Sequence, residues 1–174
     1  MMQTDFKAIS LSFKNAPVAI REIIALDELS IKTILGRISE ILPVQDALVL
    51  STCNRTEVYY TATKDLTQEI IQLIGFNKGI ENVLQYESYF DKMDSAEAVK
   101  YLFRVSMGLE AQVVGDMQIA NQVKRAYQWT ADMDYAGPFM HRLLHSIFFT
   151  NKRVVQETSF RDGAASVSYA AVEM

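Results

Sequence analysis

The sequence predicts an α+β fold: a small, mostly antiparallel sheet packed with helices, then a helical second half that leads into a long linker helix. Two observations support this class. Alternating apolar and polar residues, which are typical of strands, occur only before residue 63. From Ser95 to about residue 158, apolar residues recur instead at helical spacing. Because the strand and helix patterns are segregated along the chain, an antiparallel sheet is favoured over a parallel one.

The first expected strand covers residues 6–13, where Ile9 and Leu11 alternate with Ser10 and Ser12. Such alternation is typical of a half-buried strand, with one face in the core and the other toward water.

Two helices are expected to follow this strand. Pro17 opens the first, over residues 18–28, and Ser30 can cap the second. Pro43 ends the second helix, because proline cannot continue a helical hydrogen-bond ladder. The apolar positions of the second helix recur at helical spacing and are Ile31, Ile34, Leu35, Ile38 and Leu42.

A strand, a polar loop and a second strand are expected next. Residues 47–50 form a short apolar run, and residues 58–62 alternate in polarity. Residues 51–56, with the sequence STCNRT, are expected to form the loop between them. A helix over residues 65–76 should then end before Gly79.

The rest of the chain is expected to be helical. The spacing predicts helices over 95–114, 116–133 and 138–158, the last after Gly137 and Pro138. The segment between residues 80 and 92 fits no single pattern. We expect residues 1–160 to form one domain and residues 161–174 to begin a linker.

The composition is that of an ordinary globular protein, and it narrows the possible partners. Net charge is −4 at pH 7 and the sequence pI is about 5.2, which does not suggest a nucleic-acid binder by overall charge. Basic residues gather late in the chain, where a solvated helix face is favoured over a nucleic-acid surface. They are Lys124, Arg125, Arg142, Lys152, Arg153 and Arg161.

The cysteine count, the N-terminal residues and the length of the apolar runs predict the cellular location. A single cysteine excludes an internal disulfide and fits a reducing cytoplasm. No signal peptide is expected, and no apolar run reaches the length of a membrane span.

Cys53 is the first candidate for chemistry. A free cysteine is most often a small apolar filler of the core. Here, however, its neighbours are polar on both sides, and Arg55 could favour the reactive thiolate. Loop amides and the Asn54 side chain could stabilise an oxyanion. From the residues alone, a reactive cysteine and a buried filler both remain open.

Metal and cofactor sites are not expected in this chain. His141 and His145 are four residues apart on a predicted helix, but no glutamate follows His141 as in metalloproteases. The sequence also reveals no third ligand for a metal ion. None of the seven glycines has the spacing of a dinucleotide-binding loop, so the chain is not expected to bind a nicotinamide by itself.

Residues 51–59, STCNRTEVY, resemble the active-site segment of glutamyl-tRNA reductases. Further blocks occur in the family's order and cover nearly the whole chain. They are Ala16-Pro17 with Arg21-Glu22, Leu102-Phe103-Arg104-Val105 with Gly108-Leu109-Glu110, Gly115-Asp116-Met117-Gln118-Ile119 with Gln122-Val123-Lys124, Lys152-Arg153-Val154 with Glu157-Thr158, and Gly163-Ala164-Ala165-Ser166-Val167-Ser168. The chain is therefore identified as a somewhat diverged member of this family, from its N-terminal catalytic domain.

The resemblance implies an NADPH-dependent oxidoreductase of tetrapyrrole biosynthesis in the cytoplasm. Cys53 would attack the ester of glutamyl-tRNA, and NADPH would reduce the resulting thioester to glutamate-1-semialdehyde. The family's NADPH domain, and the C-terminal domain that makes a homodimer, are expected outside this chain, which alone should not complete the reduction. The semialdehyde aminomutase is a further partner implied by the resemblance, and no membrane is involved.

The resemblance also assigns site residues. Thr52, Asn54 and Arg55 would bind the glutamyl group, with Arg55 suited to its carboxylate. Further substrate contacts are implied for Asp116, Met117, Gln118 and Gln122.

The sequence departs from the family pattern at several positions. Tyr101 stands where the family has a histidine thought important for activity, so it either takes part in the site or only packs beside Leu102 and Val105. Phe13 and Ala111 also replace the usual histidine and serine, and Asp116 replaces a glutamate.

Two other functions stay open. One is a degenerate family member that binds glutamyl-tRNA or a protein partner without catalysis. The other is a stand-alone cysteine hydrolase.

Overall fold

The computed structural model describes residues 5–160, and its centre is a four-stranded sheet. The strands are β1 (Phe6–Ser12), β2 (Ala47–Ser51), β3 (Arg55–Thr61) and β4 (Asp91–Asp94). They lie in the order β2-β3-β1-β4, and each neighbouring pair is antiparallel.

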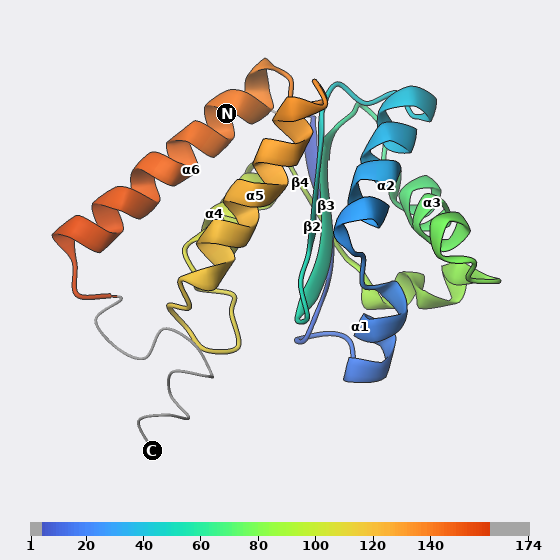
Figure 1. Cartoon of the computed structure of the whole chain (residues 1–174), viewed down its shortest axis with the longest axis horizontal. Helices are drawn as coiled ribbons and strands as arrows, with labels where there is room; N and C mark the ends of the chain where they lie inside the picture. The colour runs from blue at the N-terminus through green and yellow to red at the C-terminus, as the bar shows by residue number, and fades with distance from the viewer. Residues whose placement is uncertain (1–4, 161–174) are drawn as a thin grey trace.

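Helices cover both faces of this sheet (Figure 1). Those of one layer are α1 (Val18–Ile24), α2 (Glu28–Ile41) and α3 (Thr67–Lys78). Those of the other are α4 (Ser95–Ser106), α5 (Gln118–Asp132) and α6 (Pro138–Glu157). A 3₁₀ helix, η1 (Val83–Tyr89), precedes β4, so the segment without a clear pattern forms η1 and the start of β4. The α+β prediction is confirmed, whereas the predicted linker from residue 161 lies outside the described residues.

Strand β1 is buried on both faces, so the expectation of a half-buried strand was wrong. Ile9 and Leu11 belong to the core under α1, α2 and α3, and Phe6 belongs to the core under α4, α5 and α6. Ser10 and Ser12 face this second layer and are only 1% and 4% exposed. The physical reason is that β1 lies inside the sheet, between β3 and β4, with helices on each side.

The start of α2 differs from the prediction. Asp27, rather than Ser30, is the N-cap, and its carboxylate accepts a hydrogen bond from the Ser30 amide at 2.8 Å. The buried side chains of α2 are Ile31, Ile34, Leu35 and Ile38, as the helical spacing predicted.

The predicted helix over 95–114 was too long, because α4 ends at Ser106. Residues 107–117 instead form the α4–α5 loop, in which Gly108 and Gly115 have φ angles of 80° and 88°. The Gly115 amide donates to the Gly108 carbonyl at 3.0 Å and closes the loop. A Cβ on Gly108 would lie 3.0 Å from the Asp116 carbonyl oxygen, so the closure requires glycine there.

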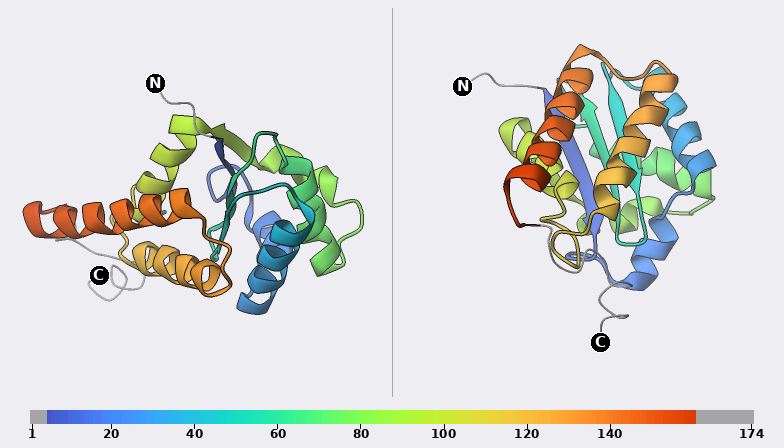
Figure 2. Two further views of the ribbon diagram at one scale, coloured as in Figure 1. Left: turned by 90° about the horizontal axis from the view of Figure 1, so that it is seen from above. Right: turned by 60° about the vertical axis from the view of Figure 1, so that its left-hand side comes forward.

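Helices α5 and α6 are tied to the beginning of β2. The Asp46 carboxylate accepts a hydrogen bond from the Met140 amide at 3.3 Å, and Gly137 is the N-cap of α6. On α5, the Thr130 hydroxyl donates to the Ala47 carbonyl at 2.6 Å. These bonds fix the layer that carries one wall of the candidate site, while the far half of α6 extends beyond the sheet (Figure 2).

No helix in residues 5–160 combines the length and the apolar character needed to cross a bilayer.

Candidate active site

Cys53 lies at the tip of the hairpin that joins β2 to β3, and its side chain is exposed. The Thr52 amide donates to the Arg55 carbonyl at 2.8 Å and closes the turn. Within the turn, the Asn54 amide donates to the Thr52 hydroxyl at 3.1 Å. The Asn54 carbonyl accepts a hydrogen bond from the Phe13 amide at 2.9 Å. The thiol is therefore held on a rigid turn and faces solvent, so it is not a core filler.

A cavity of about 50 Å³ lies beside Cys53, between the hairpin tip, the α4–α5 loop and the start of α5. It is lined by Thr52, Cys53, Asn54, Arg55, Ala111, Asp116, Gln118, Ile119 and Gln122. The structure thus brings together seven of the nine site residues predicted from the sequence. Met117 and Tyr101 are not among the lining residues: Met117 is 42% exposed, and Tyr101 contacts Arg55 through its hydroxyl.

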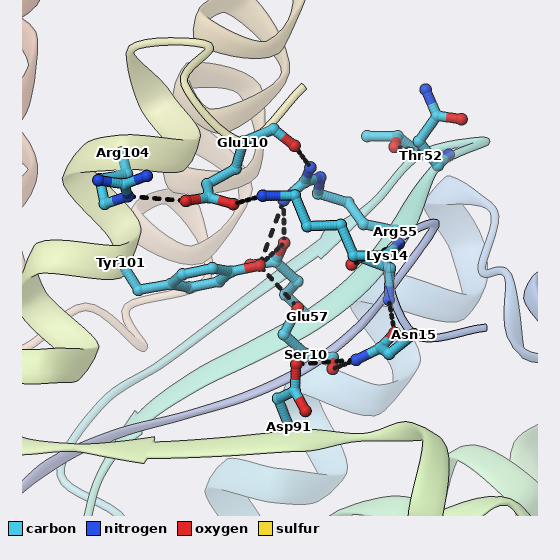
Figure 3. Close-up of polar contacts among 12 residues, drawn as sticks. Ser10, Lys14, Asn15, Thr52, Arg55, Glu57, Asp91, Tyr101, Arg104 and Glu110 are labelled. Atoms are coloured by element: carbon cyan, nitrogen blue, oxygen red, sulfur yellow. Dashed lines mark hydrogen bonds and ion pairs between the residues drawn. The ribbon is translucent and has the colours of Figure 1, made fainter. Parts of the chain in front are cut away.

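Arg55 belongs to β3 and is only 3% exposed, so its placement in a loop was wrong. Its guanidinium donates to the Glu57 carboxylate at 2.7 Å and to the Tyr101 hydroxyl at 3.4 Å. A second nitrogen donates to the backbone carbonyl of Glu110 (Figure 3). Arg55 therefore joins the strand to the α4–α5 loop while it also lines the cavity.

Glu57 is completely buried, yet its carboxylate is well supplied with partners. It accepts hydrogen bonds from Arg55, from the Tyr59 hydroxyl and, at 3.4 Å, from Tyr101. Burial raises the pKa of Glu57, and the positive charge of Arg55 opposes that rise. A buried carboxylate with its partners intact can orient Arg55, but losing either partner would leave an unpaired charge in the core.

Tyr101 joins this network from α4. Its hydroxyl lies 2.9 Å from the Ser10 hydroxyl and also contacts Arg55 and Glu57. The Tyr101 hydroxyl therefore has polar partners in addition to any packing of the ring beside Leu102. Burial raises the pKa of Tyr101 above its already high ordinary value, so the group is a hydrogen-bonding one and not a base at neutral pH.

The α4–α5 loop is anchored by Glu110, whose carboxylate receives two cations. Lys14 forms an ion pair with one carboxylate oxygen, and Arg104 contacts the other at 2.7 Å. Burial raises the pKa of Glu110, but the hydrogen bonds and charges of Lys14 and Arg104 outweigh it and lower the pKa overall. Because the Glu110 carbonyl binds Arg55, this anchor sets the position of the cavity wall.

Several residues of this network were missed by sequence reasoning. They are Ser10, Lys14, Glu57, Arg104 and Glu110. For Glu57 a signal existed, because residues two apart on a strand share a face and Arg55 is its neighbour. The others meet only in the folded chain.

A larger cavity of about 300 Å³ lies at the opposite end of the sheet, near Lys7 and Lys92. Lys92 pairs there with Asp65 at 3.5 Å and with Glu87 at 3.3 Å. It holds none of the predicted site residues. The smaller cavity beside Cys53 is the better candidate because it combines a nucleophile with polar walls.

The late basic residues are exposed on α5 and α6 as far as the structure describes them, which fits a solvated face. Arg161 lies outside the described residues.

The fold and site together define a class of α+β domain in which a sheet hairpin presents one exposed thiol above a buried arginine–glutamate pair. A family model described as "Glutamyl-tRNAGlu reductase, N-terminal domain" matches residues 9–158. The chain therefore belongs to the family of glutamyl-tRNA reductase N-terminal domains.

Individual relatives agree with this assignment. A glutamyl-tRNA reductase of Cytophaga hutchinsonii is 56% identical over 174 residues, which are 99% of this chain and 41% of that protein. One of Syntrophus aciditrophicus is 36% identical over 169 residues, 95% of this chain and 40% of that protein. The structure of glutamyl-tRNA reductase from Methanopyrus kandleri matches with a TM-score of 0.79 and 28% identity, over 98% of this chain and 39% of that one. The chain thus spans about two fifths of the length of these relatives.

Proposed function

We propose that this chain is the catalytic domain of a glutamyl-tRNA reductase and that Cys53 is its nucleophile. The thiolate sulfur attacks the ester carbonyl carbon of glutamyl-tRNA and forms a thioester. The bond from that carbon to the ribose oxygen breaks, and the oxygen takes a proton as the tRNA leaves. The observation that supports this most is the exposed Cys53 on a rigid hairpin tip, beside a cavity lined by the family's motif residues.

Completion of the reaction is assigned to parts of the protein outside this chain. NADPH would supply the hydride that reduces the thioester to glutamate-1-semialdehyde, a precursor of tetrapyrroles. Binding of NADPH, a homodimer and contact with the semialdehyde aminomutase are proposed for the longer protein in the cytoplasm. Within residues 5–160, no glycine-rich turn between a strand and a helix offers a nicotinamide site.

We propose that the α4–α5 loop shifts when substrate binds. The cavity of about 50 Å³ is far smaller than the ~300 Å³ at which small-molecule sites begin. One guanidinium nitrogen of Arg55 donates a hydrogen bond to the Glu110 carbonyl. A substrate carboxylate oxygen could accept this hydrogen bond instead. We propose that the glutamyl carboxylate displaces this carbonyl and that Thr52 and Asn54 contact the same group.

Three further predicted residues, Asp116, Gln118 and Gln122, line the opposite wall. Asp116 follows the Gly115 turn, and its carboxylate accepts a hydrogen bond from the Gln118 amide at 2.9 Å. Gln118 and Gln122 lie one turn apart on α5 and can both face the substrate. Met117 is assigned an outer contact only, because it lies beside this wall without lining the cavity.

A domain that binds glutamyl-tRNA without catalysis is the second candidate. The observation that favours it is that Tyr101, in the position of the family's histidine, is bound within a buried network and cannot serve as a base. A stand-alone hydrolase is not favoured, because the family match extends over residues 9–158.

The test is to incubate the chain with glutamyl-tRNA, without NADPH, and to examine the Cys53 peptide by mass spectrometry. We expect a glutamyl adduct on Cys53 and free tRNA, and neither with Cys53→Ser. Binding of glutamyl-tRNA without an adduct would instead establish the second candidate. With NADPH added, the chain alone should form no aldehyde, and coupled NADPH oxidation would contradict the assignment of reduction to another domain.

A further inference from the structure

A second cluster of chemically capable side chains lies on α5 and α6, outside the cavity beside Cys53. His141 and His145 are one turn apart on α6 and are exposed, and Tyr127 faces them from α5. The Tyr127 hydroxyl lies 2.5 Å from His141 Nδ1 and 3.2 Å from His145 Nε2. One phenol oxygen thus lies within hydrogen-bond distance of two imidazole nitrogens.

Tyr127 supplies the third metal-binding atom that the histidine pair alone lacked. The sequence revealed two histidines without a third donor, and in residues 5–160 no three His, Cys, Asp or Glu side chains gather as a metal site. The third donor here is a phenol from a different helix, 14 residues before His141. Only the packing of α5 against α6 brings it into place.

We propose that Tyr127, His141 and His145 form a binding site for a divalent transition-metal ion of the kind that prefers imidazole, such as Zn²⁺. The tyrosine ring is nearly perpendicular to both imidazole rings, at 89° and 88°, and its hydroxyl is within hydrogen-bond distance of one nitrogen of each. Zinc binds imidazole nitrogen at about 2.0–2.1 Å, so a small displacement of the phenol makes room for it. Water can take the fourth position, since both histidines are exposed.

Metal binding has a defined proton balance. The single phenol proton serves only one of the two hydrogen bonds, so the other uses an imidazole N–H. An ion needs the lone pairs of both nitrogens, so that imidazole moves its proton to its other ring nitrogen. The phenol loses its proton to the solvent, and one proton is released for each ion bound. A phenol is protonated at neutral pH, so the ion itself must drive this ionisation.

The site would act on the neighbouring cavity through α5. This helix carries Gln118 and Gln122 in the wall beside Cys53. An ion bound by Tyr127 and the two histidines would cross-link α5 to α6 and stiffen that wall.

The test is calorimetric titration of the 174-residue chain with Zn²⁺, without an affinity tag and after removal of metal. A Cys53→Ser background is needed, because the exposed thiol is itself a zinc ligand. We expect one ion per chain, and a loss of affinity on the order of tenfold or more with either His141→Gln or His145→Gln. The chain has two histidines, so these variants leave no other imidazole pair.

The role of Tyr127 is tested separately. Tyr127→Phe should weaken binding and abolish the proton release, which is measured by repeating the titration in buffers of different ionisation enthalpy. With Cu²⁺ as a second probe, the visible phenolate-to-copper charge-transfer band should disappear in the same variant. Tyr86→Phe, on the opposite side of the sheet, is the matched control and should change neither. The proposal is overturned if no saturable binding occurs, if the histidine variants bind as well as the parent, or if Tyr127→Phe leaves affinity and proton release unchanged.

Discussion

The two faces of the sheet are built in different ways. Toward α1, α2 and α3 the face is mostly apolar, with Ile9 and Leu11 on β1, and its polar pair near the hairpin, Ser51 and Thr56, is uncharged. Toward α4, α5 and α6 it begins with Phe6 but becomes polar near the hairpin tip, where Arg55 and Glu57 are buried. Apolar residues at such positions are often as stable as a buried ion pair or more so. The buried Arg55 and Glu57 are therefore explained better by the positioning of a functional group than by a gain in stability.

The largest effect expected from this difference follows the loss of Glu57. Glu57→Ala leaves the Arg55 guanidinium buried without its carboxylate, so we expect a loss of about 3–5 kcal/mol in the free energy of unfolding. The α4–α5 loop, which forms one wall of the cavity beside Cys53, should also become less ordered, because Arg55 ties β3 to this loop. Urea denaturation measures the first effect, and the rate of adduct formation by the folded protein measures the second.

Ile9→Ala is the matched control on the apolar face. It should cost a comparable ~2–5 kcal/mol, because it opens a cavity in the core. Adduct formation by the folded fraction should be unchanged. If Ile9→Ala slows the adduct as much as Glu57→Ala does, the polar face has no special role in the site.

The next effect concerns pH, and it has opposite signs for two carboxyl groups of the polar face. The pKa of Glu110 is lowered in the folded chain, so its stabilisation is present above its ordinary pKa of 4.5 and is lost as the pH falls below it. The pKa of Glu57 is raised, so its contribution is present below 4.5 and is lost as the pH rises through the folded value.

Glu110→Gln should therefore cost about 1.5–3 kcal/mol at neutral pH, the range for hydrogen bonds to a charged group. It should also flatten the acid side of the stability profile, measured by urea denaturation between pH 3 and pH 7. Asp132→Asn, at an exposed carboxylate on α5, is the control and should leave the profile unchanged. If the pH dependence of stability on the acid side is the same in Glu110→Gln, the ion pairs of Glu110 with Lys14 and Arg104 contribute little to stability.

How much of this site was predictable differs between its parts. The STCNRT segment predicted the loop between β2 and β3 that carries Cys53, because local sequence sets the turn, whereas the residues alone left a buried and a reactive Cys53 both open. The end of α4 at Ser106 was not predicted, since apolar spacing continues past it and only the conformation of Gly108 stops the helix. Contacts between residues far apart in the sequence could not be predicted either. The Ser10–Tyr101 pair is separated by 91 positions, and nothing local encodes it.

Arg55→Lys separates substrate binding from thiol reactivity. Lysine keeps the charge but loses the planar fork that serves Glu57, Tyr101 and the loop carbonyl together. We expect use of glutamyl-tRNA to weaken by about 1–3 kcal/mol. Alkylation of Cys53 by a small neutral reagent should change little, because the guanidinium is directed at its buried partners. Equal slowing of both reactions would mean that Arg55 activates the thiolate instead.

The smallest effect concerns Tyr101, where the sequence resemblance implies a histidine in the family. Tyr101→Phe removes one hydroxyl from the buried network, which should cost about 0.5–1.5 kcal/mol in stability. If Tyr101 also helps to hold Arg55, adduct formation should slow mildly, by a few-fold. Ser10→Ala is the matched control, because it removes the 2.9 Å hydrogen bond from the other side and leaves the tyrosine contacts with Arg55 and Glu57 in place.

These two variants distinguish a positioning role from packing. Positioning predicts that Tyr101→Phe slows the adduct while Ser10→Ala costs similar stability without slowing it. Packing predicts that both lower the melting temperature and that neither changes the rate. Tyr101→His completes the comparison: faster adduct formation at an unchanged melting temperature would mean that an imidazole adds proton transfer, which a phenol with a raised pKa cannot provide at neutral pH. A lower melting temperature with no gain in rate would mean that the network around Arg55 and Glu57 is adapted to tyrosine.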